Sequence, residues 1–175
     1  MKTSSSLSKW LHPGEVAPPA STTTGDPDLS ALRAYWTGKC NSRTMPSRAD
    51  INPGEIRLLL PNIFIMEIHQ PLRFRVRLAG TRICERWGAN ITGKWLDELD
   101  YDGVREKAIE QYATVARTGV PRCDVMEFVS DHGRYLHYRR LLLPLSEDGV
   151  TPNMLLGMQK AIGIDGYQRS VPKWI

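Results

Sequence analysis

The sequence predicts an α+β fold, in which helices pack on one face of a five-stranded antiparallel sheet and an amphipathic helix precedes them. Two strand-like segments, residues 62–68 and 74–80, are joined by a short loop with a proline, as in an antiparallel hairpin. Three more follow at residues 121–130, 134–145 and 153–162, separated by short turns. Helical patterns lie between the two groups and do not alternate with single strands. This order excludes a doubly wound nucleotide-binding fold.

The first expected element is an amphipathic helix with Asp28 at its N-cap. Leu29, Leu32, Tyr35 and Trp36 follow at helical spacing and form one apolar stripe. Such a stripe can pack against another copy of the chain or against a partner protein. These four residues are therefore a candidate interface, and we expect a homo-oligomer or a complex with a signalling partner.

The second strand of the hairpin shows strict alternation of apolar and charged residues. Phe74, Val76 and Leu78 are expected on a buried face, and the arginines between them on a solvated face. The buried face of such a sheet is concave, so a pocket can lie between it and the helices that cover it.

Those covering helices are expected at residues 81–88 and 101–118, the second ending at Gly119. On the strand that follows, alternation allows only one of His137 and Tyr138 to face the interior. A ligand pocket and a filled core would use the same apolar wall, and both interpretations stay open. The candidate ligand-binding residues are Phe64, Met66, Phe74, Val76, Ile83, Trp87, Tyr112, Tyr138, Leu156 and Met158.

Local motifs resemble a bacterial subfamily of PAS domains. A tryptophan ends the first helix at Tyr35-Trp36, and MPSRADINPGEIRLLLPN (residues 45–62) precedes the first strand. RLAGT (residues 77–81) closes the second strand, and a Thr-Gly pair follows at 92–93. The resemblance covers about residues 29–162. It implies a stand-alone PAS-like sensor or adaptor in signal transduction, which binds a small molecule, a partner protein or a second copy through its N-terminal helix.

The PAS resemblance brings haem and flavin into question, and the residues argue against both. A haem-binding PAS domain takes its iron ligand from a histidine on the helix before the third strand, and residues 102–118 contain none. A flavin photosensor of this fold needs a reactive cysteine in a specific helical motif, and the residues around Cys84 do not match it. The identity of any cofactor therefore stays open. Cys40, Cys84 and Cys123 are far apart, so neither a metal site nor a disulfide framework is expected.

Composition sets the expected surroundings of the domain. The net charge of +4 is spread along the chain, so no nucleic-acid partner is expected. No apolar run approaches the ~20 residues of a membrane-spanning helix, and no apolar segment follows the first lysine as in a secretory signal. We expect a cytoplasmic protein with a flexible arm over residues 1–27, a domain over 28–164 and a tail over 165–175.

The sequence is compatible with three classes of function. The first is a sensory or adaptor domain with a ligand in its interior, and the second is a ligand-free scaffold for dimerisation or protein interaction. The third is a small α+β enzyme. The densest acids, Asp97, Glu98, Asp100 and Asp102, are expected in exposed segments, and no nucleophile–base motif is present. We therefore expect no catalytic residues.

Overall fold

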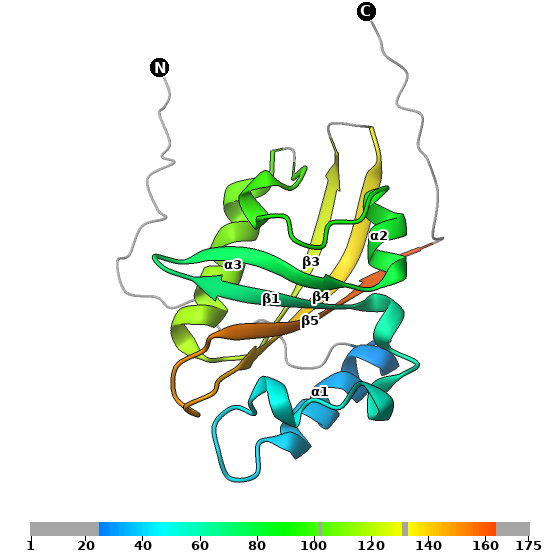
Figure 1. Cartoon of the computed structure of the whole chain (residues 1–175). Helices are drawn as coiled ribbons and strands as arrows, with labels where there is room; N and C mark the ends of the chain where they lie inside the picture. The colour runs from blue at the N-terminus through cyan, green and yellow to red at the C-terminus, as the bar shows by residue number, and fades with distance from the viewer. Residues whose placement is uncertain (1–24, 102, 131–132, 164–175) are drawn as a thin grey trace, which may run out of the picture.

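The computed structural model describes residues 25–101, 103–130 and 133–163, so most of the predicted arm and the predicted tail lie outside these ranges (Figure 1). The five strands form one antiparallel sheet in the order β2-β1-β5-β4-β3, which confirms the predicted fold class. The elements in chain order are α1 (Pro27–Lys39), η1 (Arg48–Asp50), η2 (Pro53–Ile56), η3 (Leu60–Asn62), β1 (Ile63–His69), β2 (Arg73–Ala79), α2 (Thr81–Trp87), η4 (Leu96–Glu98), α3 (Arg105–Thr118), β3 (Arg122–Val129), β4 (Tyr135–Leu145) and β5 (Met154–Ala161).

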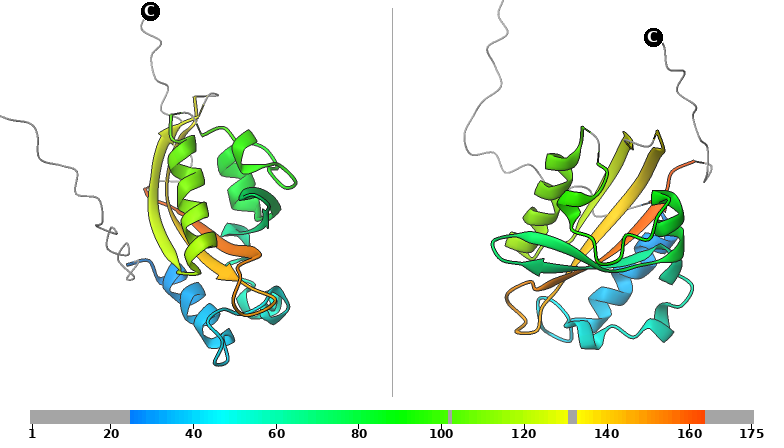
Figure 2. Two further views of the ribbon diagram at one scale, coloured as in Figure 1. Left: turned by 90° about the vertical axis from the view of Figure 1, so that its left-hand side faces the viewer. Right: turned by 45° about the horizontal axis from the view of Figure 1, so that its top comes forward.

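Buried apolar side chains form two clusters, one on each face of the sheet. The middle helices α2 and α3 lie on one side, here called the inner face, whereas α1 packs on the opposite, outer face (Figures 1 and 2). The inner cluster contains Phe64, Met66, Phe74, Val76, Ile83, Ile91, Leu96, Leu99, Tyr101, Ala108, Tyr112, Ala113, Val115, Ala116, Met126, Phe128, Leu136, Tyr138, Leu142 and Leu155. The outer cluster contains Leu29, Leu32, Trp36, Met45, Ile51, Ile56, Ile63, Ile65, Leu141, Leu143, Leu145, Leu156 and Met158.

Helix α1 is capped two residues earlier than its sequence suggested. Asp26, not Asp28, is the N-cap, because its Oδ1 accepts from the backbone amides of Asp28 and Leu29, and Pro27 occupies the first turn. Asp28 instead forms an ion pair with Lys160 on β5, with 2.6 Å between Oδ2 and Nζ. This pair and the cap fix the start of α1 against the sheet.

The apolar stripe of α1 is buried within the chain itself. Leu29 and Leu32 are fully buried and Trp36 is nearly so, while Tyr35 is half-buried at the edge of the outer cluster. The prediction that this stripe forms an interface with another chain therefore needs correction. The sheet presents apolar residues on both faces, and α1 covers the outer one. The four residues are already engaged when the domain folds.

A β-bulge changes the alternation of β2. Ile65 pairs with Leu78, but Met66 pairs with Val76, so Arg77 is an extra residue in the ladder. Phe74 and Val76 face inward as predicted. Beyond the bulge the pattern is reversed, and Leu78 lies on the outer face, where 43% of its surface is exposed. The prediction of one continuous apolar face was wrong at Leu78.

Two glycines allow backbone and ring to approach closely. A Cβ atom on Gly80 would overlap the backbone carbonyl groups of Leu60 and Pro61, so β2 ends directly against η3. A Cβ atom on Gly157 would overlap the aromatic ring of Phe64, which lies across β5 at the position paired with Gly157. The absence of a side chain at Gly157 thus makes room for the Phe64 ring on the inner face.

Candidate functional site

The candidate site is the interior between the inner face of the sheet and helices α2 and α3. Strand and helix periodicity both direct apolar side chains into this layer. Eight of the ten predicted ligand-binding residues lie there: Phe64, Met66, Phe74, Val76, Ile83, Tyr112 and Tyr138 are buried in the inner cluster, and Trp87 is partly buried against it. Tyr138, rather than His137, is the member of its pair that faces inward.

Leu156 and Met158 lie on the opposite face, so their assignment to the interior was wrong. Leu156 pairs with Ile65 on β1 and with Leu143 on β4, and both of these residues face outward. Side chains that are directly opposite in a sheet share a face, so Leu156 follows them to the outer cluster. On β5 it is Leu155 that faces the interior. A strand that is apolar on both faces gives no sign in its sequence of which residues face inward.

Aromatic rings line one side of the interior. The ring centroid of Trp87 lies 4.9 Å from that of Tyr101 in an edge-on arrangement. Tyr101 lies 5.3 Å from Phe128, and Phe128 lies 6.4 Å from Tyr138. These rings come from α2, β3, β4 and the segment before α3, so the wall joins the helical layer to the sheet. Ring pairs at these separations stabilise the interior beyond the burial of their area.

The wall surrounds a buried arginine that the sequence analysis did not single out. Arg140 lies on β4 with none of its surface exposed, and its guanidinium carbon lies 4.5 Å from the ring centroid of Tyr112. Its Nη2 donates to Oε1 of the buried Gln111 on α3. Its Nε and Nη1 have no hydrogen-bond partner among the residues that the structure describes. Strand alternation places Arg140 on the same face as Tyr138 and Leu142, but which face that is follows only from the structure.

The tyrosines around Arg140 are neutral at ordinary pH. Burial raises the pKa of Tyr138 to about 12, and it also raises those of Tyr101 and Tyr112. Burial disfavours the charge of Arg140, but the adjacent tyrosine side chains and the carboxylate of Asp124 outweigh this and hold its pKa above the ordinary value. The interior therefore contains a permanent positive charge among neutral hydroxyl groups.

Other polar groups complete the site. Gln159 on β5 is buried directly beside Arg140 in the sheet, and its Oε1 accepts from Nη1 of Arg86 on α2 at 3.3 Å. The guanidinium carbon of Arg86 lies 5.8 Å from the ring centroid of Tyr138. Within the described part of the chain, the Tyr138 hydroxyl and Trp87 Nε1 have no hydrogen-bond partner. The indole N–H of Trp87 and the hydroxyl of Tyr138 can both donate a hydrogen bond.

Residues 25–160 match the sequence profile of the PAS domain family. The chain belongs to the PAS domain family. The PAS domain of BvgS from Bordetella pertussis is 20% identical, with a TM-score of 0.49 over 64% of this chain and 87% of that one. A LOV protein from Rhodobacter sphaeroides is 13% identical, with a TM-score of 0.48 over 66% of this chain and 71% of that one.

A light-oxygen-voltage domain studied with a flavin analogue is 16% identical, with a TM-score of 0.52 over 64% of this chain and 84% of that one. This likeness supports the fold of the PAS domain and carries no information about a ligand. No curated protein matches the sequence significantly.

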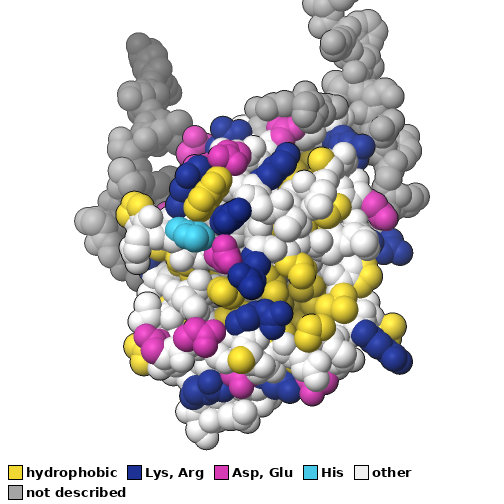
Figure 3. Space-filling model, in the orientation of Figure 1, with side chains coloured by type: hydrophobic (Ala, Val, Ile, Leu, Met, Phe, Trp, Pro, Cys, Tyr) yellow, Lys and Arg dark blue, Asp and Glu magenta, His cyan; other side chains and the backbone are white. Residues whose placement is uncertain are grey.

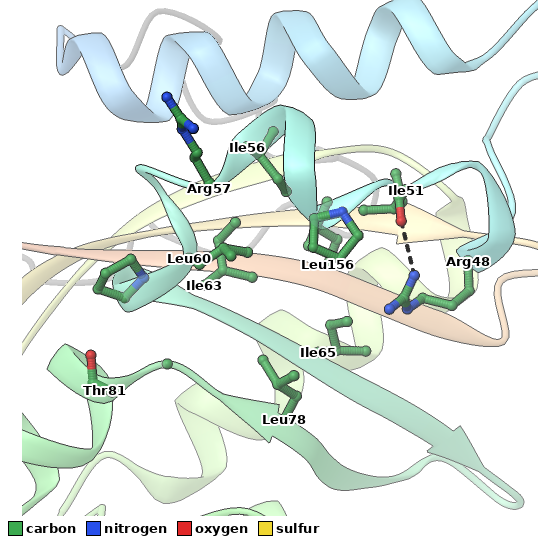
Figure 4. Close-up of a pocket in the computed structure, with 13 residues that line it drawn as sticks. Arg48, Ile51, Ile56, Arg57, Leu60, Ile63, Ile65, Leu78, Thr81 and Leu156 are labelled. Atoms are coloured by element: carbon green, nitrogen blue, oxygen red, sulfur yellow. Dashed lines mark hydrogen bonds between the residues drawn. The ribbon is translucent and has the colours of Figure 1, made fainter.

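The PAS domain has a groove of about 390 Å³ on the outer face (Figure 4). Ile63, Ile65, Leu78 and Leu156 form part of its apolar floor. Hydrophobic side chains gather near the middle of the face in Figure 3, with Lys and Arg side chains beside them. The groove is lined by Arg48, Ile51, Pro53, Ile56, Arg57, Leu60, Pro61, Ile63, Ile65, Leu78, Gly80, Thr81 and Leu156.

The bulge at Arg77 helps to form this groove, because it directs Leu78 outward beside Ile65. In the close-up, Leu78 and Ile65 lie near each other below the 3-10 turns, and Arg48 donates to the carbonyl oxygen of Ile51 at 3.1 Å (Figure 4). The groove does not follow from the sequence pattern, since strict alternation places Leu78 in the interior.

Cys84 contacts polar atoms at the end of β2. Its sulfur lies 3.8 Å from the Ala79 carbonyl oxygen and 3.7 Å from Oδ1 of Asn90.

Across the three described ranges, no cluster of His, Cys, Asp and Glu is suitable for a metal ion. In those same ranges, no helix has both the length and the hydropathy that crossing a bilayer requires.

Proposed function

We propose that this PAS domain is a sensory module that binds a small molecule between its inner face and helices α2 and α3. Membership of a family of sensory and signalling domains supports the general role. The aromatic wall and the buried polar groups of the inner face support the position of the ligand. A partner protein would then read the change in the domain, in a cytoplasmic signalling pathway.

The observation that carries the proposal is the set of buried donors on the inner face. Polar atoms of Arg140, Tyr138 and Trp87 are buried without a hydrogen-bond partner among the described residues. Buried polar atoms in folded proteins are nearly always paired, so three such residues around one interior region are unusual for a simple core. A bound molecule with acceptor atoms would pair them.

The experiment is a search for binders to the purified full-length chain. Native mass spectrometry before and after denaturation would detect a molecule that copurifies, and a thermal-shift screen of neutral and charged metabolites would detect one that does not. We expect at least one compound to raise the melting temperature by mass action. A complete screen with no stabilising compound, together with a protein mass equal to that of the chain alone, would overturn the proposal.

The proposed role is sensing without catalysis. Of the acids considered for an enzyme, Asp97 and Glu98 form ion pairs with Arg73 at the surface, with Asp97 Oδ2 3.0 Å from Arg73 Nε. Asp102 lies outside the described residues. Asp100, which was expected in an exposed segment, is instead partly buried, and its Oδ2 is shielded from solvent.

The outer groove favours a second candidate function, the binding of a partner protein. Arg48 and Arg57 line a groove whose floor is apolar, and the adjacent Leu58 has 85% of its surface exposed. Apolar contact and positive charge together suit an acidic amphipathic segment of the partner.

This candidate is tested with a labelled helical peptide that has leucines on one face and glutamates beside them. We expect fluorescence anisotropy to show binding that weakens in Arg57→Glu and in Leu78→Glu. A peptide with lysines in place of the glutamates is the matched control. Equal binding of both peptides, or equal binding by the two variants, would exclude this use of the groove.

A further inference from the structure

Arg140 has more hydrogen-bonding capacity than its surroundings use. A guanidinium group has five N–H donors, and those of Nε and Nη1 account for three of them. In the described part of the chain Gln111 accepts a hydrogen bond from Nη2 of Arg140, and the Tyr112 hydroxyl lies beside the same guanidinium group. A fully buried cation is costly unless an acceptor or an opposite charge offsets the loss of water. The three N–H donors of Nε and Nη1 thus have no acceptor among the residues that the structure describes.

Asp124 supplies a negative charge that favours the charged form of Arg140, but it also pairs with a second arginine. Asp124 lies directly opposite Arg140 on β3, and 7% of its side chain is exposed. Its Oδ2 accepts from Nε of Arg122 at 2.6 Å. Arg86 on α2 also approaches the Tyr138 ring, so the guanidinium groups of Arg86, Arg122 and Arg140 and one carboxylate lie in this part of the inner face. The local balance of charge is positive.

The remaining unpaired donors lie around the same space. Tyr138 precedes Arg140 by two residues on β4, so both side chains project from the same face. Trp87 packs edge-on against Tyr101 in the adjoining aromatic wall. Arg140 and Trp87 can only donate, and a tyrosine hydroxyl can donate as well. A ligand that satisfies this set has acceptor oxygens at one end and a flat apolar body at the other.

We infer that the interior site takes a small aromatic carboxylate, whose oxygens accept from Arg140 and whose ring lies against the aromatic wall. The inference rests on the proposed function and adds the chemical class of the ligand. Arg140 is the residue that selects for charge, and Trp87, Tyr101 and Phe128 select for a planar body.

The first experiment compares two probes of nearly equal shape on the full-length chain. Benzoate carries the negative charge, and benzamide replaces it with a neutral amide. Calorimetric titration at constant ionic strength is expected to give at least about tenfold tighter binding of benzoate, because hydrogen bonds to charged groups are stronger than neutral ones. Acetate and inorganic phosphate, which have no ring, are expected to bind more weakly than benzoate.

The second experiment assigns the effect to Arg140. Arg140→Gln removes the charge and keeps a polar side chain, whereas Arg139→Gln makes the same change at the next residue, which faces the other side of the sheet. We expect benzoate to bind Arg139→Gln like the wild type and to lose its advantage over benzamide in Arg140→Gln. If Arg140→Gln does not fold, the Nε–H resonance of Arg140 in the wild type provides the readout. It is expected to shift on titration with benzoate and to stay in place with benzamide.

The outcomes separate this inference from the proposed function. Equal affinity for benzoate and benzamide, or an unmoved Arg140 resonance, would overturn the carboxylate assignment and leave a neutral ligand in the interior. If phosphate binds and benzoate does not, an inorganic anion is the ligand and the assignment is equally overturned. If neither probe binds and the metabolite screen finds no binder, the interior site itself is wrong.

Discussion

The indole Nε1 of Trp36 donates to the backbone carbonyl oxygen of Pro144 at 2.8 Å, in a buried contact between α1 and β4. β4 pairs with β3 only as far as Leu142, so the Pro144 carbonyl has no partner strand on that side. Pro144 has no N–H group, so its backbone needs no acceptor on that side of the strand, and only its carbonyl oxygen needs a partner. The tryptophan at the end of the first helix thus completes the hydrogen bonding of the longest strand.

Replacing this tryptophan tests how firmly α1 is attached. Trp36→Phe keeps an aromatic ring and leaves the Pro144 carbonyl buried without a donor. We expect the free energy of unfolding to fall by about 1–3 kcal/mol in urea titrations. Leu58→Ala, which shortens an exposed side chain, is the control and should have little effect. An unchanged urea midpoint in Trp36→Phe would show that water reaches this carbonyl.

Replacing a glycine by alanine is expected to have opposite effects on stability at two positions. Gly157→Ala places a methyl group against the ring of Phe64, and such overpacking costs about 1–3 kcal/mol. Gly38→Ala lies in α1 with no atom within 4 Å of the new methyl, and should stabilise the domain by about 0.5–1 kcal/mol through helix propensity. Thermal unfolding of both variants measures the difference. A loss of stability in Gly157→Ala that Phe64→Leu does not reduce would contradict the assigned overlap.

The buried hydroxyl of Tyr138 allows a test of whether this donor has a hydrogen-bond partner. Without a ligand, Tyr138→Phe removes a polar atom that has no partner in the described residues, so we expect unchanged or slightly raised stability. Tyr112→Phe is the matched change, and we expect it to lower stability because that hydroxyl lies beside Arg140. Urea unfolding at neutral pH compares them. Equal losses in both variants would show that the Tyr138 hydroxyl is paired.

Acid should destabilise the loop between α1 and η1. Asp50 Oδ2 accepts from the Ser47 amide and hydroxyl and from Arg43, and these contacts lower its pKa to about 2. The folded pKa lies below the unfolded value of about 4, so the carboxylate stabilises the fold above pH 4. This stabilisation is lost as the pH falls from about 4 to about 2.

Asp50→Asn removes that titration. In urea unfolding at a series of pH values, we expect the stability of the variant to fall less between pH 5 and pH 2.5 than that of the wild type. Asp148 accepts from Ser146, Val150 and Thr151 in the turn before β5, and its pKa is lowered as well. The variant should therefore keep part of the acid sensitivity. Parallel stability curves for the two proteins would show that the acid sensitivity arises entirely from groups other than Asp50.

The sequence predicted the architecture because periodicity and turn residues are local signals. The hairpin, the helical middle and the three final strands each appear in the pattern of apolar residues, and the structure places them in one sheet. The direction of the side chains on β5 could not be predicted in this way. Leu155 and Leu156 are both fully buried, one on each face, so only the pairing with Ile65 and Leu143 distinguishes them.

Two other features depended on information that the local sequence lacks. The bulge at Arg77 reversed the direction of Leu78, and a bulge of this kind arises from the register with β1. Arg140 follows Arg139 in a strand with many apolar residues, and two adjacent arginines suggest a solvated surface. Its burial results from Gln111 and Tyr112 on α3, which meet β4 only in the folded domain.

β5 belongs to both clusters at once, and this has a mechanical consequence. Its odd-numbered residues Leu155 and Gln159 face the interior, whereas Leu156 and Met158 support the helix on the other side. Any ligand that displaces the strand by a fraction of an ångström on one face moves the packing beneath α1 by the same amount. The first helix is therefore placed to transmit occupancy of the interior outward, without any contact of its own with the ligand.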